Sequence, residues 1–484
     1  MFKESTKNTT NTWKVKAIER RKELTKERKR NKELRSSRDN WKCKYKELSK
    51  RISKVAEGNI ANSLTESYKP DRYKYSCVLI TLCIKLLSYS GSSLRSSRHF
   101  IAQLYIVLEF ETFDIPSHTT IRMWACKLGY YQNEFNCIDE GDWSLIVDES
   151  VSLGENRVLL VLGLRLDQWD FKYAARSQDI EVLHFGVSPK WKSEEISSIL
   201  EGIMDKINVK YVVSDKGNNL MKSYKISDLL HIPDCTHALA KALEHYCKKC
   251  EEASSFLSQC GLLRQKWNMG KKTVYMPPSQ RKKARFHNLA PITDWAKKVL
   301  VIIDTLPDEI QLHLSFLHEK QQWINEFDWI NKMIQSINVI LKTNGFNNKT
   351  YVDISKKIAA RRLNKQEISC YGENFLIEID NYLSSLDKIA SCEQTLFCCS
   401  DIIESTFGRM KYRTSPNTPF GMTEFALAIA SLGKSYNKEQ VTQIMETVKE
   451  KDIKEWKADN LPPSLFEKKR ALLGENFGEE IYLN

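Results

Sequence analysis

The chain has 484 residues, enough for three or four domains that each bury a hydrophobic core. Its 42% hydrophobic and 28% charged residues are typical of a soluble globular protein and exclude a fully disordered one. The longest apolar stretch, 77–89, is too short for a membrane span and contains Lys85. The polar N-terminus lacks the apolar segment of a secretory signal. Thirteen cysteines without regular spacing indicate reduced thiols, so we expect a cytoplasmic protein.

The formal net charge of +13 is concentrated in the first 54 residues. They contain 20 Lys and Arg against 7 Asp and Glu, an excess that equals the net charge of the whole chain. Residues 14–56 contain neither Pro nor Gly, and a 4-3-4-3 apolar spacing runs through Trp41, Tyr45, Leu48, Ile52 and Val55. We predict a basic N-terminal helix and linker over 1–70. The helix either tracks DNA or dimerises, or it is a solvated helix with one apolar face. A segregated basic arm without a clean apolar surface favours nucleic acid over a membrane.

Residues 71–135 are predicted to form a helical unit. Apolar periodicity indicates helices at 78–87 and 93–110, and a third begins after Pro116 and Ser117 and ends at Gly129. This layout is typical of a helix-turn-helix DNA-binding domain. In that arrangement His118, Thr119 and Arg122 face the DNA groove, while Ile121 and Trp124 pack inward. The alternative is a three-helix unit that binds nothing.

From residue 143 the apolar period changes to that of strands. We predict strands at 143–151, 157–166, 179–186, 210–215 and 229–234, with helices at 193–207 and 220–224. A turn signal at 154–156 predicts a hairpin between the first two strands. The order of three strands, helix, strand, helix and strand resembles the ribonuclease H-like arrangement, an α/β fold with a mixed sheet between helices. We assign the first part of this core to 140–237.

Three acids stand at informative positions in this layout. Asp148 and Asp215 each follow an apolar strand, on strands predicted to be neighbours, and Glu404 lies in a predicted helix at 400–411. Carboxylate oxygens suit hard divalent cations, and two ions about 4 Å apart can stabilise a phosphoryl displacement. We therefore predict that these three residues are catalytic and bind two Mg²⁺ or Mn²⁺ ions per active site. Glu149 should point to the opposite strand face, and Asp401 competes with Glu404 for the third position.

Between the second and third acids the pattern is helical, which predicts an insertion over 238–395 whose two ends lie close together. The third-acid helix occupies 396–436, and a helical C-terminal tail occupies 437–484. A basic run at 266–285 is either a loop that binds DNA phosphates or a solvated loop. Its candidate contacts are Lys271, Lys272, Arg281, Lys282 and Lys283. Cys247 and Cys250 hint at zinc, but no second cysteine pair follows at finger spacing.

The chain resembles the DDE transposases of bacterial insertion sequences. The resemblance is carried by residues 115–124, by 147–150 with Asp148, by 213–219 with Asp215, by the acid and histidine pair Asp234 and His237, and by Glu404 with Lys411 seven residues later. It implies that Asp234, His237 and Lys411 assist the three acids. It also implies an enzyme that binds the ends of a mobile DNA element, cleaves them and joins the 3′-hydroxyl to target DNA. Double-stranded DNA would be the partner, and at least a dimer would hold two ends in the nucleoid.

Two other functions fit the same residues. One is a domesticated DNA-binding protein that has kept the scaffold without catalysis, and the other is a ribonuclease H-like nuclease that only hydrolyses. His237, taken alone, is also compatible with a structural histidine.

Overall fold

The computed structural model describes residues 68–88, 90–108, 114–135, 138–153, 156–279, 289–363, 368–390, 395–413, 423–431, 436–463 and 465–473, with isolated positions between 20 and 42. The chain forms two units: Met1–Leu79 with Gln103–Asp114, and Ile80–Ala102 with Ile115–Asn484. The predicted basic helix over 1–70 and its apolar seam lie almost wholly outside the described residues.

Two helices follow the predicted linker. They are α3 (Cys77–Ser88) and α4 (Leu94–Val107), and they match the helices predicted at 78–87 and 93–110. In the smaller unit, Lys74 Nζ lies 2.7 Å from Asp114 Oδ1. Even α3, the apolar stretch singled out in the sequence, is too short for a bilayer, and no helix within the described ranges has the length and apolarity of a membrane span.

Five strands form one mixed sheet in the order β3-β2-β1-β4-β5. Their bounds are β1 (Asp142–Leu153), β2 (Asn156–Arg165), β3 (Ile180–Ser188), β4 (Asn208–Ser214) and β5 (His231–Pro233). β2 is antiparallel to β1 and to β3, whereas β4 is parallel to β1 and β5 is parallel to β4. The predicted hairpin is present, because pairing of β1 with β2 continues to Leu153 opposite Asn156. All five predicted strands and the α/β class are thus confirmed.

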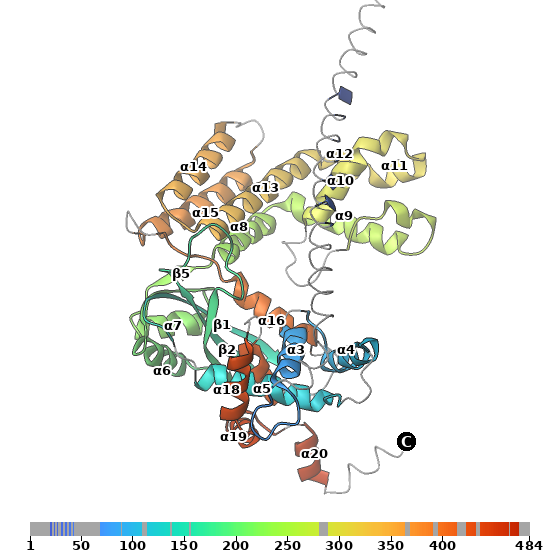
Figure 1. Cartoon of the computed structure of the whole chain (residues 1–484). Helices are drawn as coiled ribbons and strands as arrows, with labels where there is room; N and C mark the ends of the chain where they lie inside the picture. The colour runs from blue at the N-terminus through green and yellow to red at the C-terminus, as the bar shows by residue number, and fades with distance from the viewer. Residues whose placement is uncertain are drawn as a thin grey trace, which may run out of the picture. The chain divides into compact units, whose positions relative to one another are not determined.

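Both faces of the sheet are covered. The helices α6 (Ser193–Met204) and α7 (Asn218–Ile226) pack on one face, against Leu145 and Val147 of β1 (Figure 1). The alternating residue Ile146 belongs to the hydrophobic core of the opposite face, because successive strand side chains point to opposite sides. Since both faces are buried, β2 is apolar almost throughout rather than alternating.

A long helix, α5 (His118–Glu134), packs on β3 and on the C-terminal elements η4 (Glu424–Leu427), α17 (Ala428–Ser431), α18 (Lys438–Thr447) and α19 (Glu450–Asn460). Ser117 caps it as predicted, accepting a hydrogen bond from Thr120 N at 3.0 Å. The prediction that Gly129 ends this helix is wrong, because α5 continues to Glu134. A Cβ at Gly129 would lie 1.8 Å from the Leu427 carbonyl oxygen, so this glycine serves close packing rather than termination.

The C-terminal segment predicted as a helical tail contains α18, α19 and α20 (Leu465–Leu473). At least one of these helices packs on the sheet: Trp456 of α19 stacks on Phe185 of β3, with ring centroids 6.1 Å apart. This segment therefore completes the layer that α5 forms over the sheet.

The insertion predicted over 238–395 is helical in its described residues. It contains α8 (Cys235–Lys249), α9 (Glu251–Trp267), η1 (Lys271–Tyr275), α10 (Ala290–Ile302), η2 (Ile303–Thr305), α11 (Asp308–Leu314), α12 (Phe316–Glu319), α13 (Gln321–Asn344), α14 (Asn348–Leu363) and α15 (Cys370–Asp387). Its two ends meet, as predicted: the Cys235 amide donates to the Cys398 carbonyl at 2.8 Å. The chain then continues into α16 (Asp401–Arg413).

Candidate functional site

Asp148 lies within β1, and Asp215 directly follows β4, the strand that pairs with β1 in parallel. β1 and β4 are paired as far as Ile146 opposite Val213, and each aspartate lies two residues beyond that pair. Strand alternation places Asp148 on the face of Ile146 and Asp215 on the face of Val213, and both of those residues belong to the core opposite α6 and α7. The two carboxylates are therefore expected at the same level of two neighbouring strands and on one face of the sheet.

Glu149 lies on the other face, as the alternation predicts. Its Oε1 accepts a hydrogen bond from Arg157 Nη1 at 2.8 Å. It is a structural ion-pair partner and a matched neighbour against which Asp148 can be compared.

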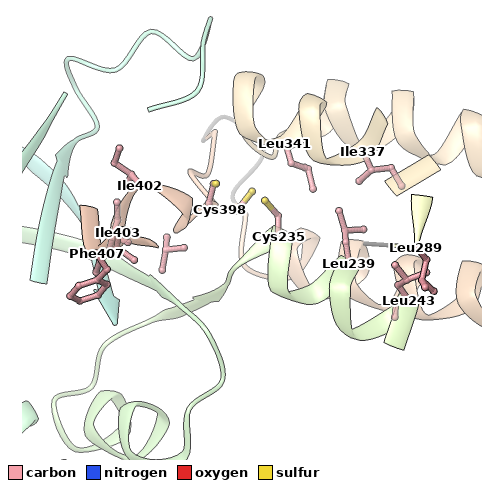
Figure 2. Close-up of a cluster of buried hydrophobic side chains, with 14 of the residues drawn as sticks. Cys235, Leu239, Leu243, Leu289, Ile337, Leu341, Cys398, Ile402, Ile403 and Phe407 are labelled. Carbon is pink, nitrogen blue, oxygen red and sulfur yellow. The ribbon is translucent and has the colours of Figure 1, made fainter. Parts of the chain in front are cut away.

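Glu404 reaches the same region from a helix. α16 packs against β1 and buries Ile402, Ile403 and Phe407, which Figure 2 shows along one side of the helix. The Glu404 side chain remains 57% exposed, and its Oε1 lies 3.6 Å from His237 Nε2. Asp401, the competing acid, instead forms an ion pair with Lys342 of α13. This arrangement favours Glu404 over Asp401 as the third acid.

His237 is held by Asp234. The Asp234 side chain is fully buried and its Oδ1 accepts hydrogen bonds from His237 Nδ1 at 3.0 Å and from His237 N at 2.7 Å. The second bond caps α8, for which Asp234 is the N-cap residue. Oδ2 accepts from the Ser400 amide at 2.5 Å, one residue before α16. The acid thus fixes the imidazole and joins the starts of α8 and α16.

The charges of this pair follow from these bonds. The hydrogen bond to Asp234, reinforced by the negative charges of Asp234, Glu404 and Asp215 and opposed by partial burial, raises the pKa of His237 to about 9. Burial alone would raise the pKa of Asp234, but the hydrogen bonds from His237 and Ser400 hold that pKa below its ordinary value. At neutral pH the pair is therefore an imidazolium next to a carboxylate.

A cleft of about 890 Å³ opens beside these residues. Its walls come from the sheet edge and from α8 and α15, and they include Asp215, Lys216, His237, Lys241, Glu378 and Tyr382. One of the two strand acids and the histidine thus face a space large enough for part of a polymeric substrate.

Tyr224 lies behind this edge, on α7. Its hydroxyl is buried, and burial together with the negative charges of Asp215 and Asp148 raises the pKa of Tyr224 well above its usual range.

The donor set fits Mg²⁺ or Mn²⁺ chemically. Asp148 and Asp215 are half-buried and Glu404 is exposed, so all three offer hard carboxylate oxygens with room for water or substrate oxygens. They are not drawn tightly together, however. Among the residues that the structure describes, the only group of three metal-ligating side chains with ligand atoms all within 4.8 Å is Asp234, Cys235 and Cys399. Two ions shared by three acids do not require that compactness.

The predicted DNA-binding residues are only partly placed. Ile121 and Trp124 are buried, as predicted, while Thr119 is exposed and Arg122 forms an ion pair with Glu424. In the basic run, Lys271 is exposed but Lys272 pairs with Glu309, and η1 makes this part helical rather than an open loop. Arg281, Lys282, Lys283 and the side chain of Lys411 lie outside the described residues. Their predicted DNA contacts stay predictions.

Two cations of the cleft were not singled out from the sequence. Lys216 directly follows Asp215. Lys241 lies four residues after His237 on α8, so His237 and Lys241 are on the same face of that helix. Helical spacing from His237 was the signal that could have identified Lys241.

No protein-family model and no curated protein matches the chain. The assignment of a function therefore rests on the residues and their geometry.

Proposed function

We propose that this protein is a DDE transposase built on a ribonuclease H-like core. The observation that supports this most is the origin of Asp148, Asp215 and Glu404. Asp148 lies in β1, Asp215 directly follows the parallel neighbour β4, and Glu404 is on a helix packed against β1. Three acids from such elements, one of which lines a large cleft, suit metal-dependent phosphoryl transfer.

The sheet topology is consistent with this core. An order of β3-β2-β1-β4-β5, with β2 antiparallel to its neighbours, is the arrangement expected from the ribonuclease H-like resemblance. The helical insertion leaves after β5 and returns just before α16, so the third acid comes back to the sheet despite the 189 residues that separate it from Asp215.

Each residue has a distinct proposed task. Asp148, Asp215 and Glu404 would hold two Mg²⁺ or Mn²⁺ ions, which supply an activated attacking oxygen and stabilise the leaving one. His237 positions the Glu404 carboxylate, because Asp234 fixes the ring and directs Nε2 toward it. Lys216 and Lys241 place positive charge along the cleft, where phosphate oxygens of a DNA strand would lie.

The proposed substrate is double-stranded DNA: the ends of a mobile element and the target into which they are joined. The basic first 54 residues supply a large excess of positive charge for DNA phosphates. Because two ends have to be joined together, we propose that the protein works as a dimer or larger assembly on DNA.

The test uses the full-length protein with labelled duplexes taken from the DNA that borders its own coding region. With Mg²⁺, we expect a nick at one position per end and joining of the freed 3′-hydroxyl to a plasmid. A shuffled duplex of the same composition is the control. Cleavage without joining would contradict the transposase in favour of a nuclease. Tight binding with neither reaction would indicate a non-catalytic DNA-binding protein.

A further inference from the structure

A second group of candidate metal ligands lies at the joint between the sheet and the helical insertion. An Asp234 carboxylate oxygen and the thiols of Cys235 and Cys399 all lie within 4.8 Å of one another, and all three residues are buried. The Cys398 thiol is not part of this group, although the Cys235 amide donates to the Cys398 carbonyl. Figure 2 shows Cys235 at the start of α8, beside the segment that carries Cys398 and leads into α16.

The backbone holds these residues together independently of their side chains. Cys235 N donates to the Cys398 carbonyl at 2.8 Å, and Ser400 N donates to Asp234 Oδ2 at 2.5 Å. The three candidate ligands therefore approach from two chain segments that are about 160 residues apart in sequence but fixed side by side. A site preorganised in this way loses little entropy when it binds an ion.

The chemistry of the group differs from that of the three-carboxylate site. Thiolates are soft ligands that select zinc over magnesium, and two sulfurs with one carboxylate fill three positions of a tetrahedral set, leaving the fourth to a water molecule. An ionised carboxylate has about four acceptor positions, and three N–H bonds to Asp234 leave one for an ion. Buried cysteines are often only small hydrophobic residues, as Cys260 is within α9. Here two thiols lie beside a buried acid instead.

We propose that one Zn²⁺ ion binds at this joint, coordinated by Asp234, Cys235 and Cys399. The Cys235 and Cys399 thiols each release a proton to solvent as their sulfur atoms bind the ion, and no other covalent bond breaks. The ion would tie the start of α8 to the start of α16, and so hold His237 opposite Glu404.

The site does not depend on the proposed transposase activity, and zinc content tests it directly. Full-length protein, expressed with zinc, purified without a metal-affinity tag and dialysed against a chelator-free buffer, is expected to contain one zinc per chain. Cys235→Ala and Cys399→Ala should each reduce the zinc bound to the folded fraction at least tenfold. The control Cys260→Ala removes an equally buried thiol of the insertion and should leave the zinc content unchanged.

Cobalt provides a second measurement that does not require the variants to fold. Replacing zinc by Co²⁺ in the wild-type protein should produce intense thiolate-to-cobalt charge-transfer absorption, which carboxylate ligands alone do not give. A wild-type protein without zinc and without this absorption would overturn the proposal. Loss of zinc in Cys247→Ala, with zinc kept in Cys235→Ala, would also overturn it by moving the ion to another cysteine pair.

Discussion

Asp215 and Asp234 occupy the same position on neighbouring strands but have different surroundings. Ser214 of β4 is paired with Pro233 of β5, and each aspartate is the next residue along its strand. Asp234 begins α8 directly, so its carboxylate caps the helix and becomes buried under His237 and Ser400. Asp215 is followed by Lys216 and Gly217, and α7 begins only afterwards, with Gly217 as its N-cap.

The difference shows that position after a strand does not by itself assign an acid to the three-carboxylate site. The length of the turn before the next helix decides whether the carboxylate caps that helix, as at Asp234, or accepts a bond within the turn, as at Asp215. Asp215 accepts a hydrogen bond from the Gly217 amide at 3.1 Å and lines the cleft. We therefore expect substitutions at the two positions to affect different properties: catalysis at Asp215, and the stability of the joint at Asp234.

The largest expected effect is on catalysis. Asp148→Asn and Asp215→Asn should each lower DNA cleavage by about 10³-fold or more, beyond the 10–100-fold typical of groups that only support a metal ligand. End binding should remain within about threefold, because most phosphate contacts lie elsewhere. The control Glu149→Gln changes the neighbouring acid on the opposite face and should retain activity. Equal losses of cleavage and binding in Asp148→Asn would contradict a catalytic role.

A smaller effect is expected on the free energy of unfolding, and here the substitution at Asp234 should matter more than the one at Asp215. Asp234→Asn should lower the free energy of unfolding by about 2–3 kcal/mol, because an amide nitrogen cannot accept all the buried N–H bonds that the carboxylate accepts. Asp215→Asn should change it by no more than about 0.5 kcal/mol, as for an ordinary surface substitution. Urea denaturation of both variants at pH 7 measures the difference. Similar losses of unfolding free energy in the two variants would contradict a structural role that is specific to Asp234.

The smallest effect concerns pH. Because the pKa of His237 is raised to about 9 in the folded protein from about 6.5 in the unfolded chain, its bond to Asp234 stabilises the fold fully below pH 6.5. That contribution is lost as pH rises through 9. His237→Gln should therefore be less stable than the wild type at pH 6, and the difference should vanish above pH 9. A difference that is constant from pH 6 to 10 would show that the raised pKa does not contribute.

Much of the fold could be predicted because its signals are local. Apolar runs bounded by turn signals predicted all five strands, and the helical periodicity of the insertion was equally clear. The candidate acids were found because each follows an apolar run or lies in the first turn of a helix. Their shared face follows from the parallel pairing of β1 with β4.

The remaining features depend on contacts between distant segments. Arg122 was assigned to a DNA groove from helix position alone, but it meets Glu424, 302 residues later in the chain. Gly129 resembles a helix stop, yet its role is to admit the backbone of Leu427. Asp401 and Glu404 are three residues apart on one helix, so the sequence does not distinguish them as candidates for the third acid. Contacts with distant residues do: Asp401 pairs with Lys342, and Glu404 lies near His237.

The most direct test of the central claim is the position of Mn²⁺ in crystals of the full-length protein. Anomalous scattering should place two ions among Asp148, Asp215 and Glu404, with carboxylate oxygens at about 2.0–2.2 Å. Glu404→Gln should remove at least one of these ions, whereas Asp401→Asn, which breaks only the pair with Lys342, should keep both. Ions bound at Asp401, or no Mn²⁺ between the two strand-end aspartates, would contradict the account.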